Sequence, residues 1–202
     1  MIKYQIDPKI KFKKIEELVD LPYVVVVNEF DEKSAKAFRD DFARALNTGQ
    51  KIVPVVIDSY GGQCYSLLSM AATIKQSPVP VATIATGKAM SCGAILFTCG
   101  AEGHRYIDPL ATLLIHDVSG HSFGKVEDVK TNAEEIERLN QMVYIMMARN
   151  IGKADDYFLK MTHDKGHADL YFSAEQCKEH NIANHIRTPS FRVKVSTETV
   201  FE

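Results

Sequence analysis

Apolar, β-branched runs that alternate with helical patterns constrain the fold of this chain more than any other feature. The runs cover residues 23–27, 52–57 and 79–85. Such runs are typical of buried strands. Helical periodicity follows the first two runs, over 32–45 and 63–75, and a third helix is expected to begin at Ser91. This alternation predicts an α/β fold with a parallel sheet and right-handed crossovers, whose functional crevice lies beyond the carboxyl ends of the strands.

The second half of the chain predicts two more strands and a long helix. The helix, over about 125–149, would be about 37 Å long, longer than one small domain needs. Its apolar stripe is wide, so we expect it to protrude and to bury its second side in a neighbouring subunit. The other expected elements are strands over 105–107 and 111–115, a helix over 155–161, a helix capped by Ser173 with Gln176, and a strand-like segment over 191–195.

Composition narrows the class of protein. The chain has 202 residues, 46% of them hydrophobic, and a net charge of −2. We predict one domain over 1–202, with residues 1–20 as an N-terminal arm. The charge balance does not favour nucleic acid, no apolar run is long enough for a membrane span, and no secretory segment begins the chain, so a cytoplasmic protein is expected. Four cysteines without a CxxC pair indicate reduced thiols.

The segment from Gly87 to Ala94 surrounds one serine, Ser91, with small residues at the expected start of a helix. Helix N-terminal amides and the aligned dipole favour negative charge, so a serine there can be a nucleophile. The ordinary alternative is that Ser91 caps the helix. Cys92 is a further candidate nucleophile, although the sequence offers no separate group that would activate its thiol. This segment alone leaves those alternatives open.

Ser91, His116 and Asp169 all fall at the ends of expected elements. A serine nucleophile needs a base within hydrogen-bond reach, and the base needs a carboxylate that orients it. The backbone amides of Gly62 and Cys92 could supply an oxyanion hole. Taken singly, His116 is equally a structural histidine and Asp169 a turn residue.

The same segments, taken together, resemble the ClpP family, the proteolytic subunits of Clp proteases, within the crotonase-like superfamily. The resemblance is carried by the order and spacing of Gly61-Gly62, the Gly87–Ala94 segment, Leu113–His116 and Asp169–Ala174, and covers roughly residues 52–186. It implies a crotonase/ClpP-like βαβ superhelical fold. The long helix, about 124–150, would be the protruding handle.

The resemblance also implies an activity and an assembly. Ser91 would be the nucleophile, His116 the general base and Asp169 its orienting carboxylate, with the amides of Gly62 and Cys92 as the oxyanion hole. Members of this kind cut unfolded polypeptides into short peptides inside heptameric rings stacked as a tetradecamer. Peptide hydrolysis needs no cofactor and no metal, and ATP would be used by a separate AAA+ unfoldase.

The chain also departs from the family pattern. Tyr60 stands where a proline usually precedes the glycine pair, and Ala168 replaces an arginine that normally links the rings. The interval between His116 and Asp169 is a few residues longer than usual, and the N-terminal arm lacks a recognisable gating loop. The sequence therefore resembles a divergent member.

Three other interpretations follow from particular residues. His163, Asp164 and His167 form an H-D-x-x-H cluster that could bind zinc, although Lys165-Gly166 interrupts a regular helix. The superfamily includes acyl-CoA hydratases and isomerases, which do not need a serine–histidine–aspartate triad. A catalytically inactive ring subunit that acts as a scaffold is the third alternative.

Overall fold

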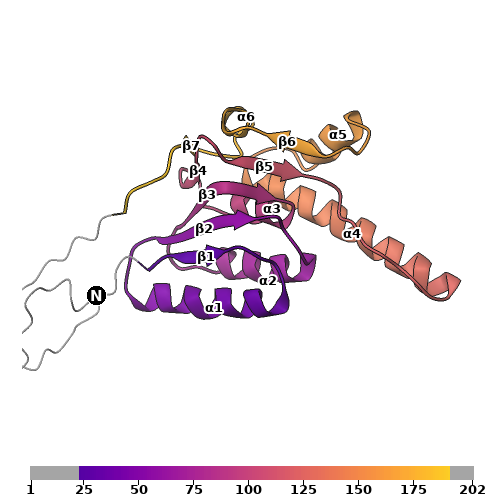
Figure 1. The fold of residues 1–202 in the computed structure, drawn as a ribbon, viewed down its shortest axis with the longest axis horizontal. Helices are drawn as coiled ribbons and strands as arrows, with labels where there is room; N and C mark the ends of the chain where they lie inside the picture. Colours follow the sequence, from indigo (N-terminus) through magenta and orange to yellow (C-terminus); the bar gives the residue numbers. More distant parts are fainter. Residues whose placement is uncertain (1–22, 192–202) are drawn as a thin grey trace, which may run out of the picture.

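A computed structural model describes residues 23–191 of the chain, in a mixed α/β fold built on a seven-stranded sheet (Figure 1). The strands are β1 (Val25–Val27), β2 (Val53–Ser59), β3 (Val81–Met90), β4 (Arg105–Ile107), β5 (Thr112–Ile115), β6 (Leu170–Phe172) and β7 (His185–Ile186). The predicted arm over 1–20 lies outside the described residues, as does the predicted strand at 191–195 except for its first residue. The predicted α/β class is confirmed.

The sheet has the order β1-β2-β3-β4-β7, and every neighbouring pair along this path is parallel. β3 is long enough to have two partners in succession. Its residues Thr83–Ala85 pair with β4, and its residues Lys88–Met90 pair with β5. The sequence predicted a strand ending at Ala85, whereas the strand continues to Met90. This extension brings the chain directly to Ser91.

Between residues 23 and 191 six helices pack around the sheet: α1 (Glu32–Asn47), α2 (Cys64–Lys75), α3 (Cys92–Thr98), α4 (Val126–Asn150), α5 (Tyr157–Asp164) and α6 (Ala174–Glu179). Capping boxes begin two of them, with Asp31 and Ser34 at α1 and with the predicted pair Ser173 and Gln176 at α6. In Figure 1, α1 and α2 lie together beside β1 and β2, whereas α5 and α6 lie at the opposite end of the molecule.

The core is continuous from β1 to α6, and α3 is buried at all seven of its residues. One charged side chain is fully buried in it. The Arg105 guanidinium donates to the carbonyl oxygens of Ile182 (2.9 Å), Asn181 (3.1 Å) and Gly100 (3.3 Å), and pairs with Glu102 at 2.8 Å. These acceptors satisfy a cation that burial would otherwise make very unfavourable.

Helix α4 projects well beyond the rest of the fold (Figure 1). Its buried residues all lie in the C-terminal half, from Leu139 onwards. The N-terminal half is exposed, including Val126 at 68% and Val129 at 38%, and Phe123 just before the helix is fully exposed. The Tyr65 hydroxyl of α2 donates to Glu135 at 2.5 Å and so links the middle of α4 to the body.

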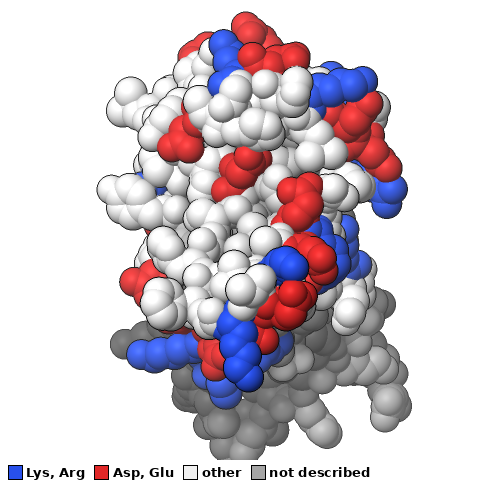
Figure 2. Space-filling view, turned by 90° about the vertical axis from the view of Figure 1, so that its right-hand side faces the viewer, with Lys and Arg blue, Asp and Glu red and all other residues white. Residues whose placement is uncertain are grey.

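The view towards the side from which α4 projects shows acidic and basic side chains interspersed among uncharged ones (Figure 2). No helix between residues 23 and 191 is both long and apolar enough to cross a lipid bilayer.

Candidate functional site

Ser91 lies at a sharp turn from β3 into α3. Its backbone has φ 54° and ψ −121°, and its amide donates to the carbonyl oxygen of Leu114 at 2.9 Å. A left-handed φ is unfavourable for a residue with a Cβ, and such strain is characteristic of functional turns. Ser91 stands at the N-cap position of α3, yet its side chain makes no capping hydrogen bond. The capping interpretation therefore does not account for this hydroxyl.

A pair of glycines brings the backbone of a neighbouring segment against Ser91. Gly61 has φ +105°, and a Cβ atom there would lie 2.6 Å from the Cβ atom and 3.1 Å from the Oγ atom of Ser91. A Cβ atom on Gly62, at φ +151°, would lie 2.5 Å from the carbonyl oxygen of Phe30. Only glycine fits at either position, because both the space and the backbone conformation exclude a side chain.

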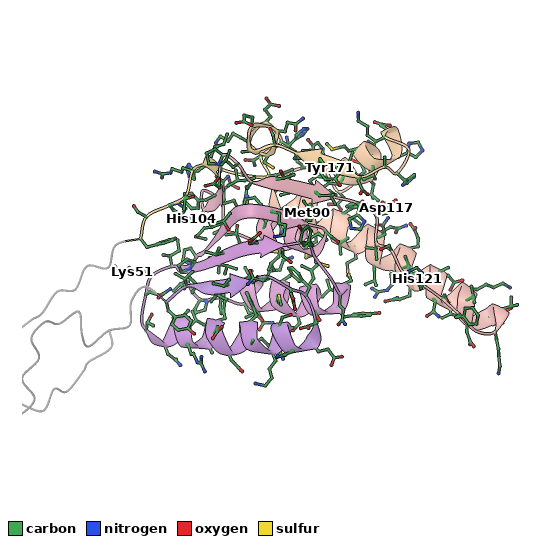
Figure 3. All side chains as sticks on the ribbon, viewed as in Figure 1. Lys51, Met90, His104, Asp117, His121 and Tyr171 are labelled. Carbon is green, nitrogen blue, oxygen red and sulfur yellow. The ribbon has the colours of Figure 1, made fainter. Side chains whose placement is uncertain are left out.

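Ser91 and His116 line the same cavity, of about 370 Å³. The cavity lies past the carboxyl ends of β2, β3 and β5, as predicted for a parallel sheet. Its lining also includes Phe30, Gly62, Gln63, Cys64, Cys92, Ile95, Val118 and Ser119. Figure 3 labels Met90 and Asp117, neighbours of the two site residues in sequence, on the α4 side of the sheet and away from Lys51.

Asp169 comes immediately before β6, which pairs antiparallel with β5. Leu113, Leu114 and Ile115 of β5 are opposite Phe172, Tyr171 and Leu170 of β6. The next pair in this register is His116 and Asp169, and side chains opposite each other in an antiparallel pair project from the same face. Asp169 itself is exposed. Among the described residues, no hydrogen bond of 3.5 Å or less joins Ser91 to His116 or His116 to Asp169. Catalytic hydrogen bonds are often long without substrate.

Cys92 follows Ser91 as the first residue of α3, where a backbone N–H has no acceptor within the helix. Its side chain is buried and its Sγ donates to the carbonyl oxygen of Gly62 at 3.2 Å. Burial raises the pKa of the Cys92 thiol to about 11. The thiol is therefore neutral at physiological pH, which argues against Cys92 as the nucleophile.

Asp117, the residue after His116, forms a contact that the sequence does not predict. Asp117 Oδ2 lies 2.7 Å from His167 Nδ1, 50 residues further along the chain. In the sequence, Asp117 follows His116 and His167 lies two residues before Asp169, so both are close to site residues. Nothing in the sequence shows that they contact each other.

The structure bears on the zinc interpretation and on Tyr60, a departure from the family pattern. The ring centroids of His163 and His167 lie 6.0 Å apart, but between residues 23 and 191 no group of three or more His, Cys, Asp or Glu side chains is arranged to hold a metal ion. Lys88 forms an ion pair with Asp58 at 2.7 Å and lies over the Tyr60 ring.

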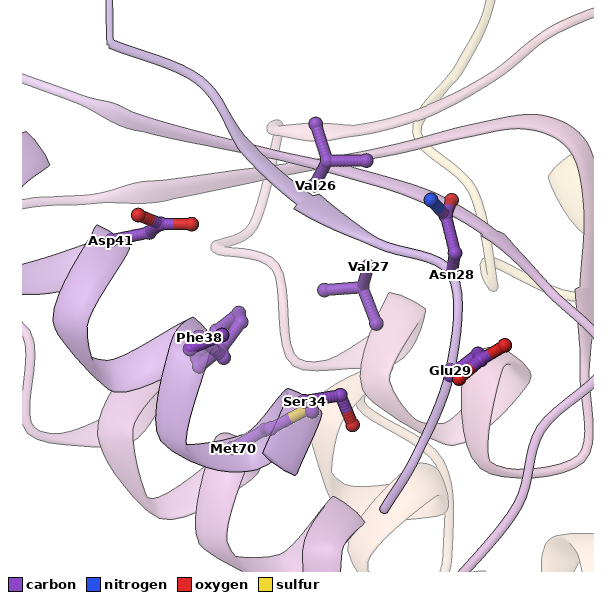
Figure 4. Close-up of a pocket in the computed structure, with 9 residues that line it drawn as sticks. Val26, Val27, Asn28, Glu29, Ser34, Phe38, Asp41 and Met70 are labelled. Carbon is purple, nitrogen blue, oxygen red and sulfur yellow. The ribbon is translucent and has the colours of Figure 1, made fainter. Parts of the chain in front are cut away.

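A second hollow, of about 300 Å³, lies between β1 and α1 (Figure 4). Its lining includes Val26, Glu29, Phe38 and Asp41. Among the described residues that line it there is no pairing of a nucleophile with a histidine, so it offers no catalytic group comparable to the pair in the Ser91 cavity.

Comparison with known protein families shows which family the chain resembles over most of its length. The family model described as Clp protease matches residues 9–190, which is most of the chain and includes every site residue described above.

Proposed function

This chain belongs to the Clp protease family, and from that premise we propose that it is a serine endopeptidase with Ser91 as its nucleophile. The observation that carries the proposal is the Ser91 hydroxyl, which stands on a strained turn, makes no capping hydrogen bond and lines a cavity together with His116. Its substrates are unfolded polypeptides, which it cleaves to short peptides.

In the proposed reaction, His116 takes the proton from the Ser91 hydroxyl as the oxygen attacks the scissile carbonyl carbon. The peptide C–N bond then breaks, and His116 returns the proton to the leaving amine. A water molecule activated by the same histidine hydrolyses the acyl-enzyme. Asp169 holds the imidazole and stabilises its protonated form. The support for Asp169 is the β5–β6 register, in which it is the next residue opposite His116.

The proposed oxyanion hole consists of the backbone amides of Gly62 and Cys92. In the parallel bridge between Phe30 and Gly62, the Gln63 amide donates to the Phe30 carbonyl oxygen at 2.7 Å. This pattern leaves the Gly62 amide outside the bridge. The Cys92 amide is the first of α3 and has no acceptor within the helix. Two such donors stabilise negative charge on the tetrahedral intermediate.

We also propose that the chain assembles into rings, as proteins of this family generally do. The support is the exposed apolar surface at the free end of α4, which comprises Phe123, Val126 and Val129. Apolar side chains gathered in this way usually mark an association surface. Heptameric rings stacked in pairs, and an AAA+ unfoldase as partner, stay predictions from the family resemblance.

A fluorophosphonate probe tests the nucleophile directly, because it reacts preferentially with an activated serine. The wild-type chain should gain one adduct by intact mass, and Ser91→Ala should gain none and cleave no peptide. Cys92→Ala and Ser119→Ala are matched controls, since each removes a nucleophilic atom from a residue that lines the same cavity but keeps Ser91, and both should still be labelled. Labelling of Ser91→Ala would overturn the assignment. Loss of labelling in Cys92→Ala would also overturn it, because it would show that the adduct forms on the thiol.

A catalytically inactive scaffold subunit is the second candidate function. It is favoured by one observation, that no hydrogen bond within residues 23–191 joins Ser91, His116 and Asp169 to one another. Assembled wild-type protein that takes up no probe would support the scaffold. An acyl-CoA enzyme, the third alternative, would bind and turn over a thioester with Ser91→Ala as readily as with wild type.

A further inference from the structure

We propose that Asp117 and His167 form a positioning pair that holds Asp169 against His116. This inference rests on the proposed function, since it concerns the two proposed triad members that follow Ser91. Neither residue of the pair is proposed to touch substrate. The described residues that line the Ser91 cavity include His116 and Val118 but not Asp117 between them.

The contact between Asp117 and His167 lies at the end of the β5–β6 ladder. The last pair of that ladder is Ile115 and Leu170, and the site residues lie just beyond it, His116 after β5 and Asp169 before β6. Just beyond these two residues, the carboxylate of Asp117, one residue after His116, meets the ring of His167, two residues before Asp169, with 2.7 Å between Oδ2 and Nδ1. The site residues therefore lie between a paired ladder on one side and a side-chain contact on the other. Without that contact, the chain before β6 has no described tie to the segment after β5.

The other oxygen of Asp117 is anchored to α4. Its Oδ1 accepts from the Tyr144 hydroxyl at 2.9 Å and from the Asn140 amide at 3.3 Å. The side-chain Oδ1 of Asn140 in turn accepts from the backbone amide of Val118 at 2.9 Å. Tyr144 and Asn140 are both buried. The carboxylate is thus fixed on a rigid helix, and His167 docks on a point that does not move with its own loop.

The charge state of Asp117 suits this role. Burial alone would raise its pKa, but the hydrogen bonds from Tyr144, His167 and Asn140 outweigh burial and hold the pKa below its usual value. Burial and the neighbouring Asp117 carboxylate raise the pKa of Tyr144. The Tyr144 hydroxyl therefore stays protonated and donates a hydrogen bond, and Asp117 accepts hydrogen bonds on both of its oxygens.

The backbone of the loop presents His167 in a specific direction. His167 has φ +62° and follows Gly166 at φ +63°. Its amide donates to the carbonyl oxygen of Thr162 at 2.8 Å, which closes the end of α5. Left-handed backbone is unfavourable for a residue with a Cβ, so glycine or asparagine would be the ordinary choice at this position. A histidine here is accounted for by its ring, which reaches Asp117.

Other titratable groups surround the pair. The ring of His163, on α5, packs edge-on against that of His167 with centroids 6.0 Å apart, and His163 Nδ1 lies 3.8 Å from Asp164. His116 adjoins Asp117 in the chain, and Asp169 is close enough to Tyr144 to affect its titration. His163 contacts the ring but not Asp117, which makes it a matched control.

The test compares His167→Gly, Asp117→Asn, the double variant and His163→Ala. His167→Gly keeps the left-handed backbone without strain and removes only the ring, so the variant is expected to fold. Each protein is treated with the fluorophosphonate probe, and both the final stoichiometry and the rate constant of labelling are measured. The stoichiometry counts correctly folded sites, whereas the rate reports how well the triad is positioned.

We expect both single variants to reach full stoichiometry at a rate constant about 10- to 100-fold below wild type, because small misplacements of catalytic groups have effects of this size. The double variant should be no slower than the slower single variant, since both remove one contact. His163→Ala should keep the wild-type rate constant.

Each result separates the possible failures. Wild-type labelling with an unchanged rate constant in His167→Gly would overturn the positioning pair and leave the proposed peptidase intact. Reduced stoichiometry at the wild-type rate constant would mean that the pair only supports folding. Additive losses in the double variant would mean that the two residues act separately. No labelling of wild type would overturn both proposals.

Discussion

Gly61 and Ser91 lie so close together that a Cβ atom on residue 61 would come within 2.6 Å of the Cβ atom of Ser91. The same atom would be 3.0 Å from the carbonyl oxygen of Met90, which is backbone and cannot rotate away. The glycine is therefore part of the shape of the Ser91 turn.

Gly61→Ala should displace Ser91 and lower the rate constant of fluorophosphonate labelling by about 100-fold or more, the scale expected for a displacement near 1 Å. Gly103→Ala is the matched control. Gly103 also has a positive φ, +78°, but a Cβ atom there would meet nothing within 4 Å. Both variants carry backbone strain of about 1–2 kcal/mol, and only the first should lose labelling. Equal labelling of the two would contradict the steric argument.

Arg105→Met should destabilise the chain by about 3–5 kcal/mol, because it leaves the carbonyl oxygens of residues 181 and 182 without their donor in the core. Arg149→Met is the control, since Arg149 also pairs with a carboxylate, Asp155 at 2.6 Å, but is 67% exposed. An exposed pair contributes about 0–1 kcal/mol. Denaturant unfolding followed by circular dichroism measures both, and similar losses would show that the buried network has no special role.

Stability should fall at high pH partly through Cys177. Burial raises the pKa of this thiol to about 12, whereas an unfolded cysteine titrates near about 8.5. Above that pH the unfolded chain loses the thiol proton while the folded chain keeps it, so unfolding becomes more favourable by up to about 1.4 kcal/mol per pH unit. Cys177→Ala lacks this dependence. The advantage of wild type over the variant at pH 7 should therefore shrink by pH 10, and a constant difference in unfolding free energy would refute the prediction.

The free end of α4 supplies a test of assembly. Phe123→Ser combined with Val126→Ser removes exposed apolar surface that should be buried between subunits. Each buried side chain of this kind contributes about 1.5–3 kcal/mol. In sedimentation velocity the double variant should therefore dissociate at a higher protein concentration than wild type. Thr131→Ala, on the same exposed half of the helix, should sediment like wild type. Unchanged sedimentation of the double variant would place the subunit contacts elsewhere.

The strand–helix alternation predicted the parallel sheet, because alternation is visible in local sequence patterns. The length of β3 is not visible in them, because it depends on pairing with distant strands. Residues Thr86 to Met90 are mixed in character, and they become strand because Lys88, Ala89 and Met90 pair with β5 and Ala89 also pairs with Ser59 of β2. β7 was not predicted, since two residues of intermediate burial have no periodicity. Its position is fixed by Tyr106 of β4, 79 residues earlier.

The candidate site divides in the same way. Ser91 and His116 were candidates from their places at element ends and were assigned roles through the family resemblance, and the structure brings both to one cavity. The left-handed backbone of Ser91 could not be predicted, because it follows from the packing of α3 beneath the sheet. The contact between Asp117 and His167 also could not, since it joins two loops across 50 residues and leaves no pattern in the sequence.

The acceptors of Arg105 also set an order of events during synthesis. Two of its carbonyl partners come 76 and 77 residues after it, and β7, which covers the free edge of β4, comes later still. A nascent chain that has reached residue 180 already contains β1 to β6, but its Arg105 lacks the two carbonyl acceptors of residues 181 and 182, and β4 has an open edge. We expect such a chain to stay protease-sensitive on the ribosome and to close only when its last residues emerge. A premature stop near residue 180 would therefore remove few residues yet leave the whole sheet without a finished core.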